Sequence, residues 1–168
     1  MNELIKQLMN AMIDYDSGDP MRIHHFLKVH AFASAIGREE GLDQRTQFIL
    51  EAAALVHDIG IHLAEETYGD CSGKYQEMVG PGEAEELMNK LGFSRDVVQR
   101  VSYLVGHHHT YDQVDDLDYR ILLEADFLVN FYEDSVSPEG QKLAYEHIFR
   151  TETGRRYCRS IYPAAAVE

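Results

Sequence analysis

The sequence contains little cysteine, the residue that stabilises small secreted domains and builds thiolate zinc sites. Its two cysteines, Cys71 and Cys158, are far apart and form no Cys-x-x-Cys pair. This argues against a disulfide framework or a zinc ribbon as the basis of the fold. Proline is also scarce, with four residues in 168. Because proline breaks helix interiors, its scarcity leaves room for long helices.

Positive charge is scarce as well. There are 15 Lys and Arg residues against 29 Asp and Glu residues, which gives a formal net charge of −14. Such a surface repels the phosphates of nucleic acids and of anionic membranes. We therefore expect neither a nucleic acid polymer nor a membrane as a partner.

No apolar run is long enough for a membrane helix. The most apolar stretches, around residues 48–61 and 121–131, contain carboxylates and are shorter than the roughly 20 residues that such a helix needs. The first sixteen residues, MNELIKQLMNAMIDYD, lack the basic start and the cleavage site of a signal peptide. A cytoplasmic location is the expectation.

Apolar residues recur mainly at steps of three and four, which predicts an all-α bundle of six or seven helices. We expect a single domain over residues 1–168, with a core at about 20–132 and C-terminal helices within 138–160 packing on it. Asp19-Pro20 and Asp43 are predicted helix starts. Residues 60–82, rich in glycine and acidic residues, are predicted to form a long functional loop.

Three short motifs carry the candidate chemistry. His25 shares a helical face with Val29 and points inward, His57 and Asp58 are adjacent at an apolar helix end, and Asp126 lies among inward-facing apolar residues. A single inward histidine is usually a core residue, and a His-Asp pair can simply cap a helix. Two buried acids need a cation or hydrogen bonds, however. Together the four residues predict a mixed nitrogen and oxygen site for a divalent metal.

In this order and local context, the motifs resemble the HD superfamily of metal-dependent phosphohydrolases, and within it a subgroup of small stand-alone bacterial hydrolases whose substrates are largely unassigned. HDIG at 57–60 matches the pair that names the superfamily, and EADFLVN contains the last ligand. The resemblance implies an HD-domain-like helical bundle and one divalent ion, which is manganese, nickel, cobalt, iron, magnesium or zinc. Its implied ligands are His25, His57, Asp58 and Asp126.

A second ion is left open by His107 and His108, which lie in the interval where two-metal members carry further histidines. The histidine that such members usually show ahead of the following helix is absent between His62 and His107, and Glu77 is the nearby substitute. Ile61 stands where relatives that cleave cyclic dinucleotides have lysine or histidine. We therefore expect one ion and a substrate other than a cyclic dinucleotide.

The implied reaction is hydrolysis of a small phosphomonoester, such as a nucleotide, by metal-activated water. Asp58 would also orient the water, Arg22 and His108 would bind the substrate, and Glu65 or His107 would protonate the leaving group. The alternatives are that His107 and His108 belong to a solvated helix cap and that Glu65 is loop surface.

Two other functions remain open. A di-iron oxygenase would use a related cluster, and the extra histidines motivate it. A non-catalytic module would bind metal and nucleotide without turnover. Since helical bundles often dimerise, a homodimer is compatible with the sequence.

Overall fold

A computed structural model describes residues 2–166, and within that range it is all-α, with no strand. The helices are α1 (Glu3–Tyr15), α2 (Pro20–Glu39), α3 (Gln44–Val56), α4 (Ile61–Tyr68), α5 (Gly73–Lys90), α6 (Arg95–Val105), α7 (Leu117–Glu133), α8 (Pro138–His147) and α9 (Glu152–Ile161), followed by a short 3-10 helix, η1 (Pro163–Ala166).

Local sequence signals set the ends of the central helices. The Asp19 side chain accepts a hydrogen bond from the backbone N–H of Arg22, and proline opens α2. Asp43 caps α3 in the same way, through two backbone N–H groups. Gly41, between the two helices, has a φ of +76°, a left-handed conformation that glycine adopts without a Cβ penalty. The chain can therefore turn back sharply and pack α3 against α2.

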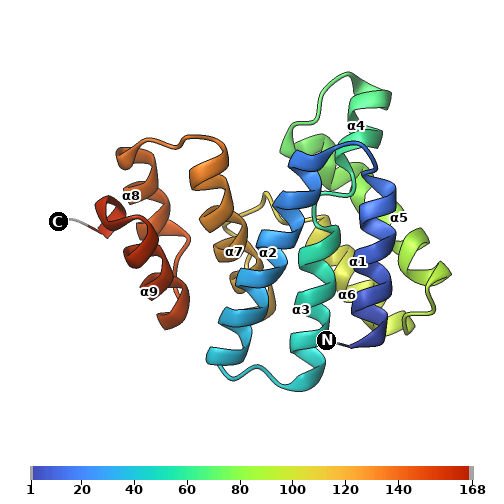
Figure 1. Cartoon of the computed structure of the whole chain (residues 1–168), viewed down its shortest axis with the longest axis horizontal. Coiled ribbons are helices and arrows are strands. Elements are labelled where there is room, and N and C mark those ends of the chain that lie inside the picture. The colour runs from blue at the N-terminus through green and yellow to red at the C-terminus, as the bar shows by residue number, and fades with distance from the viewer. Residues whose placement is uncertain (1, 167–168) are drawn as a thin grey trace.

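Helix α3 lies in the middle of the bundle and packs against α1, α2, α6 and α7 (Figure 1). Every residue from Ile49 to Val56 is buried. One cluster of buried apolar side chains extends from Ile5 to Ala165, so the C-terminal helices share the core. Contrary to the expectation that no apolar run is long enough, the stretch Gln44–Tyr68 has the length and composition to cross a membrane, but 67% of its apolar window is buried inside the fold. A core helix accounts for this pattern.

The segment 60–82, expected to be a loop, is mostly helical. It forms α4 and the first half of α5. With α4, and with the C-terminal segment divided into α8 and α9, the described chain has nine α-helices instead of six or seven. Its glycines allow close packing: a Cβ built on Gly60 would lie 2.9 Å from backbone atoms of Gly80, and one on Gly80 would lie 2.8 Å from the side chain of Val105. The composition that indicated a loop reflects close approach between helices.

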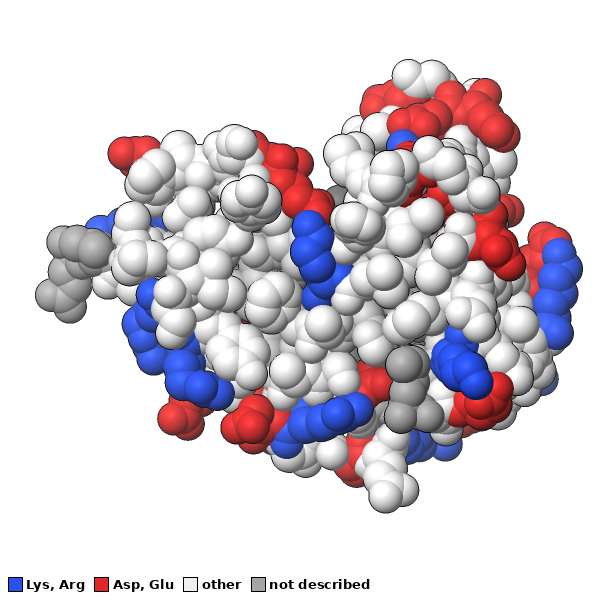
Figure 2. All heavy atoms as spheres, viewed as in Figure 1, with Lys and Arg blue, Asp and Glu red and all other residues white. Residues whose placement is uncertain are grey.

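Acidic side chains gather at the end of the molecule formed by α4 (Figure 2). Glu65 and Glu66 lie on the exposed face of this helix. This view therefore shows a group of acidic side chains near the helix that follows the HDIG motif.

Candidate metal centre

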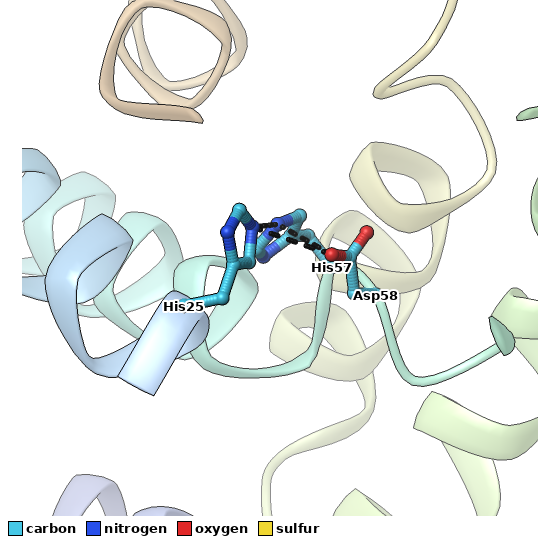
Figure 3. A group of neighbouring side chains, drawn as sticks. All are labelled: His25, His57 and Asp58. Carbon is cyan, nitrogen blue, oxygen red and sulfur yellow. Dashed lines mark hydrogen bonds and ion pairs between the residues drawn. The ribbon is translucent and has the colours of Figure 1, made fainter. Parts of the chain in front are cut away.

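Three helices bring the candidate ligands together. His25 lies in the first half of α2, His57 and Asp58 directly follow α3, and Asp126 lies in the middle of α7. Figure 3 shows the imidazoles of His25 and His57 turned toward each other, with the Asp58 carboxylate beside them. His57 is 1% exposed and Asp126 is 6% exposed. The inward orientation predicted for these residues is present in the fold.

Both imidazoles contact both carboxylates, and the ligand atoms of His25, His57 and Asp58 lie within 4.8 Å of one another. The Nε2 atom of His25 lies 3.1 Å from Nε2 of His57, 3.3 Å from Oδ2 of Asp58 and 3.2 Å from Oδ1 of Asp126. Nε2 of His57 lies 3.4 Å from the same Asp58 oxygen and 3.6 Å from the same Asp126 oxygen. Donor atoms at about 2.0–2.2 Å from a divalent ion are roughly 2.9–3.6 Å apart, so these five separations suit such an ion.

The other nitrogen of each imidazole is held by the protein. Nδ1 of His25 lies 2.7 Å from a carboxylate oxygen of Glu133, and Nδ1 of His57 lies 2.9 Å from the carbonyl oxygen of Ala54. Both partners are acceptors, so each imidazole carries its proton on Nδ1 and presents Nε2 to the two carboxylates. This arrangement is typical of metal-binding histidines.

The charges of the centre also indicate a cation. Burial lowers the pKa of His25, but the carboxylates of Asp126, Asp58 and Glu133 outweigh burial and raise it to about 9. Burial raises the pKa of Asp126, and the imidazoles of His25 and His57 reverse this and hold it well below its usual range. Two ionised carboxylates inside a fold need positive charge beside them, which protons or a divalent ion would supply.

A second group of donors shares Asp58. While Oδ2 of Asp58 faces His25 and His57, its Oδ1 lies 3.2 Å from Nε2 of His108, and His109 completes a group whose ligand atoms lie within 4.8 Å of one another. Nε2 of His109 lies 3.2 Å from the side-chain oxygen of Gln76. Burial, followed by the neighbouring His108, lowers the pKa of His109 to about 4, so its imidazole is neutral near pH 7.

A cavity of about 410 Å³ opens beside the centre. Its wall contains the ligands His25, Asp58 and Asp126 together with Arg22 and Glu65. The guanidinium of Arg22 donates to Glu65 over 2.8 Å.

The two other candidate residues lie elsewhere. His108 is buried at 1% exposure and contacts Asp58 instead of the cavity. His107 is stacked on Tyr103, with ring centroids 4.1 Å apart, and its Nδ1 bonds the Tyr103 carbonyl oxygen. His107 is absent from the cavity wall, so the fold does not bring it to the other candidates.

Sequence reasoning missed several residues around the centre. Asn130 donates to Asp126 over 2.9 Å, and Glu133 binds His25. Positions 126, 130 and 133 follow the i, i+4, i+7 pattern of one helical face, so this spacing could have identified both residues. Nothing in the local sequence indicates that Gln76 would contact His109, because that contact depends on how α5 packs.

No curated protein matches the chain. The crystal structure of a predicted HD superfamily hydrolase from an uncultured Thermotogales bacterium is similar, with 28% sequence identity and a TM-score of 0.65 over 94% of this chain and 84% of that chain. This likeness confirms the HD-like all-α fold. The family model described as HD domain matches residues 22–145, most of the sequence and all four candidate ligands, and the chain therefore belongs to the HD domain family.

Proposed function

We propose that the protein is a metal-dependent hydrolase that cleaves a small phosphomonoester. The observation that carries this proposal is a pair of imidazole Nε2 atoms, of His25 and His57, that lie 3.1 Å apart and each 3.2–3.6 Å from an oxygen of Asp58 and an oxygen of Asp126. Three of these residues form part of the wall of a cavity that also contains Arg22. Family membership and the similar HD superfamily hydrolase support hydrolysis as the reaction class. That the substrate is a phosphate ester is our own proposal.

His25, His57, Asp58 and Asp126 would hold the ion. A divalent ion bound there lowers the pKa of a coordinated water and polarises a phosphoryl oxygen. The carboxylate of Asp58 would also accept a hydrogen bond from that water and orient it. Glu133 keeps His25 in the tautomer that presents Nε2 to the centre.

Arg22 and Glu65 would act on the substrate side. The planar guanidinium of Arg22 suits two phosphate oxygens at once. Glu65 lines the same cavity, whereas His107 does not, so we propose that the Glu65 carboxylate takes up a proton released by the attacking water and passes it to the leaving group. His108 contacts Asp58 and would influence the substrate only through that carboxylate.

The cavity favours a substrate with a single phosphate. Its volume of about 410 Å³ lies within the usual range for small ligands. Among the described lining residues, Arg22 is the one Lys or Arg side chain, and Glu65, Glu133 and Asp134 add carboxylates. A second or third phosphate would meet like charge there, so we propose a nucleoside monophosphate or a smaller monoester as the substrate class.

One alternative has a specific observation in its favour. Asp58, His108 and His109 form a second group of donors beside the first, as a di-iron oxygenase would require. We place one tightly held ion at the four-residue centre, because the second group has three candidate donors and one of them is shared. The oxygenase predicts two irons per chain and consumption of oxygen.

The test is phosphate release from a panel of monoesters by protein loaded with each candidate metal, beside Asp126→Ala and Arg22→Ala. We expect turnover that depends on metal, is lost in Asp126→Ala and has a raised KM in Arg22→Ala. A loaded protein that leaves the whole panel intact would contradict the proposal. Nucleotide binding without turnover would then support a non-catalytic module.

A further inference from the structure

The side chain of Arg22 is fixed from behind by groups outside the metal centre. Its NH1 atom lies 3.3 Å from Oδ2 of Asp19 and 2.8 Å from Nδ1 of His62, while its NH2 atom faces Glu65 at the cavity. Arginine has many rotamers, and a site loses affinity for phosphate if its arginine side chain must be ordered on binding. The groups behind Arg22 thus determine how well it is prepared for a ligand.

His62 is oriented by a buried acid. Its Nε2 atom lies 2.9 Å from Oδ1 of Asp16, and the Asp16 residue is 6% exposed. An ionised carboxylate only accepts hydrogen bonds, so Nε2 carries the proton and Nδ1 keeps a lone pair for Arg22. NH1 of Arg22 also lies 3.1 Å from Nε2, but Nδ1 is nearer and has the free lone pair. The chain of contacts runs from Asp16 through His62 to Arg22.

Asp16 occupies an unfavourable place for an acid. It is the C-cap residue of α1, where the helix dipole is negative, and it is buried. Burial raises the pKa of Asp16, and the neighbouring His62 and Arg22 oppose this. Among the described residues, His62 is the one ion-pair partner of the Asp16 side chain. A buried acid at this end of a helix is costly for stability, which favours a role in orienting His62.

We infer that Asp16 and His62 are positioning residues that hold the Arg22 guanidinium at the cavity wall for a phosphate group. This inference rests on the proposed function, since it uses Arg22 as the phosphate-binding residue. Asp16, Arg22 and His62 come from the C-cap of α1, the start of α2 and the first turn of α4. Their contacts therefore connect these three helices. His62 acts through Arg22 and touches no metal ligand in the contacts of the described chain.

A double-mutant cycle with inorganic phosphate tests the inference. The probe is the dissociation constant of phosphate for Mn²⁺-saturated protein, measured by calorimetry in wild type, His62→Ala, Arg22→Ala and the double variant. We expect His62→Ala to weaken phosphate binding about tenfold, as for loss of a hydrogen bond to a charged group. In the Arg22→Ala background the same substitution should have no further effect, and Mn²⁺ content should be unchanged throughout.

A conservative variant and a control make the result specific. In His62→Gln, the amide oxygen can accept from Arg22 while the amide nitrogen donates to Asp16, so affinity should return to within about threefold of wild type. Glu66→Gln changes an exposed residue on the same helix and should bind phosphate as wild type does. For active protein, the loss in His62→Ala should fall on KM more than on kcat.

Two outcomes would overturn the inference in different ways. If His62→Ala weakens binding equally with and without Arg22, His62 acts by another route, while the proposed function stands. If Arg22→Ala alone leaves phosphate affinity and turnover unchanged, the proposed use of Arg22 fails and the inference fails with it. Nitrogen NMR of the imidazoles gives a reading independent of phosphate: neutral His62 should carry its proton on Nε2, and a proton on Nδ1 would contradict the assigned contacts.

Discussion

Glu133 offers a sharp test of how the metal centre is supported. It accepts a hydrogen bond from Nδ1 of His25 over 2.7 Å, and the Lys28 ammonium donates to its other oxygen. In Glu133→Ala, His25 loses the partner that fixes its tautomer and ring orientation. His57 keeps its bond to the backbone of Ala54. One of the two imidazoles therefore loses its fixed orientation. The Lys28 side chain is 46% exposed, so its ammonium can be hydrated once Glu133 is removed.

The expected loss of metal affinity is about 10–100-fold, or about 1.4–2.7 kcal/mol. Glu133→Gln keeps an acceptor oxygen and should lose about tenfold or less. The assay is calorimetric titration with Mn²⁺ and Zn²⁺ in the presence of a competing chelator, with circular dichroism to confirm folding. Asp134→Asn is the matched control, since it neutralises the adjacent acid of the same cavity wall. Wild-type affinity in folded Glu133→Ala would refute the reasoning.

Three further predictions concern packing, pH and the proton donor. Gly60→Ala should destabilise the fold by about 1–3 kcal/mol in urea unfolding, because the new Cβ would lie 2.9 Å from backbone atoms of Gln76 and Gly80, and unchanged stability would contradict this close approach. Burial raises the pKa of Glu124 above its ordinary value of 4.5, despite hydrogen bonds from Arg150 and Thr151. Its protonated carboxyl therefore stabilises the fold fully below pH 4.5, and this contribution is lost as the pH rises through the pKa of the folded state. The unfolding free energy of wild type relative to Glu124→Gln should therefore fall with rising pH over that window, and a pH-independent difference would be the opposite result. Glu65→Gln should lower kcat about 100-fold if Glu65 supplies the leaving-group proton, and an unchanged kcat would remove it from that role.

The centre was predictable because its signals are local. His25, His57, Asp58 and Asp126 each lie in an apolar helical context, so an inward polar side chain at each position is predicted from periodicity alone, although the Asp58 side chain is 25% exposed. The fold brings His25, His57 and Asp58 together and places Asp126 beside the two imidazoles. Glu124, in the same helix as Asp126, is also fully buried. It accepts hydrogen bonds at the start of α9, a partner that its own helix does not reveal.

The less predictable parts depend on contacts between distant helices. The glycines at 60 and 80 suggested a loop because the same residue serves turns and close packing, and only the neighbouring helix decides between them. His107 and His109 follow the same helix end, and the sequence does not reveal that the first stacks on Tyr103 while the second meets Gln76. The link from Asp16 to His62 joins two segments that the sequence separates widely.

The most direct test of the central claim is the metal content of the purified protein, measured by mass spectrometry beside Asp126→Ala and the Asp134→Asn control. We predict about one divalent ion per chain in wild type and control, and its loss in Asp126→Ala, with metal-dependent phosphate release following the same order. An ion retained with full activity in Asp126→Ala, or no ion bound by wild type after reconstitution, would contradict the assignment of these four residues as the metal centre.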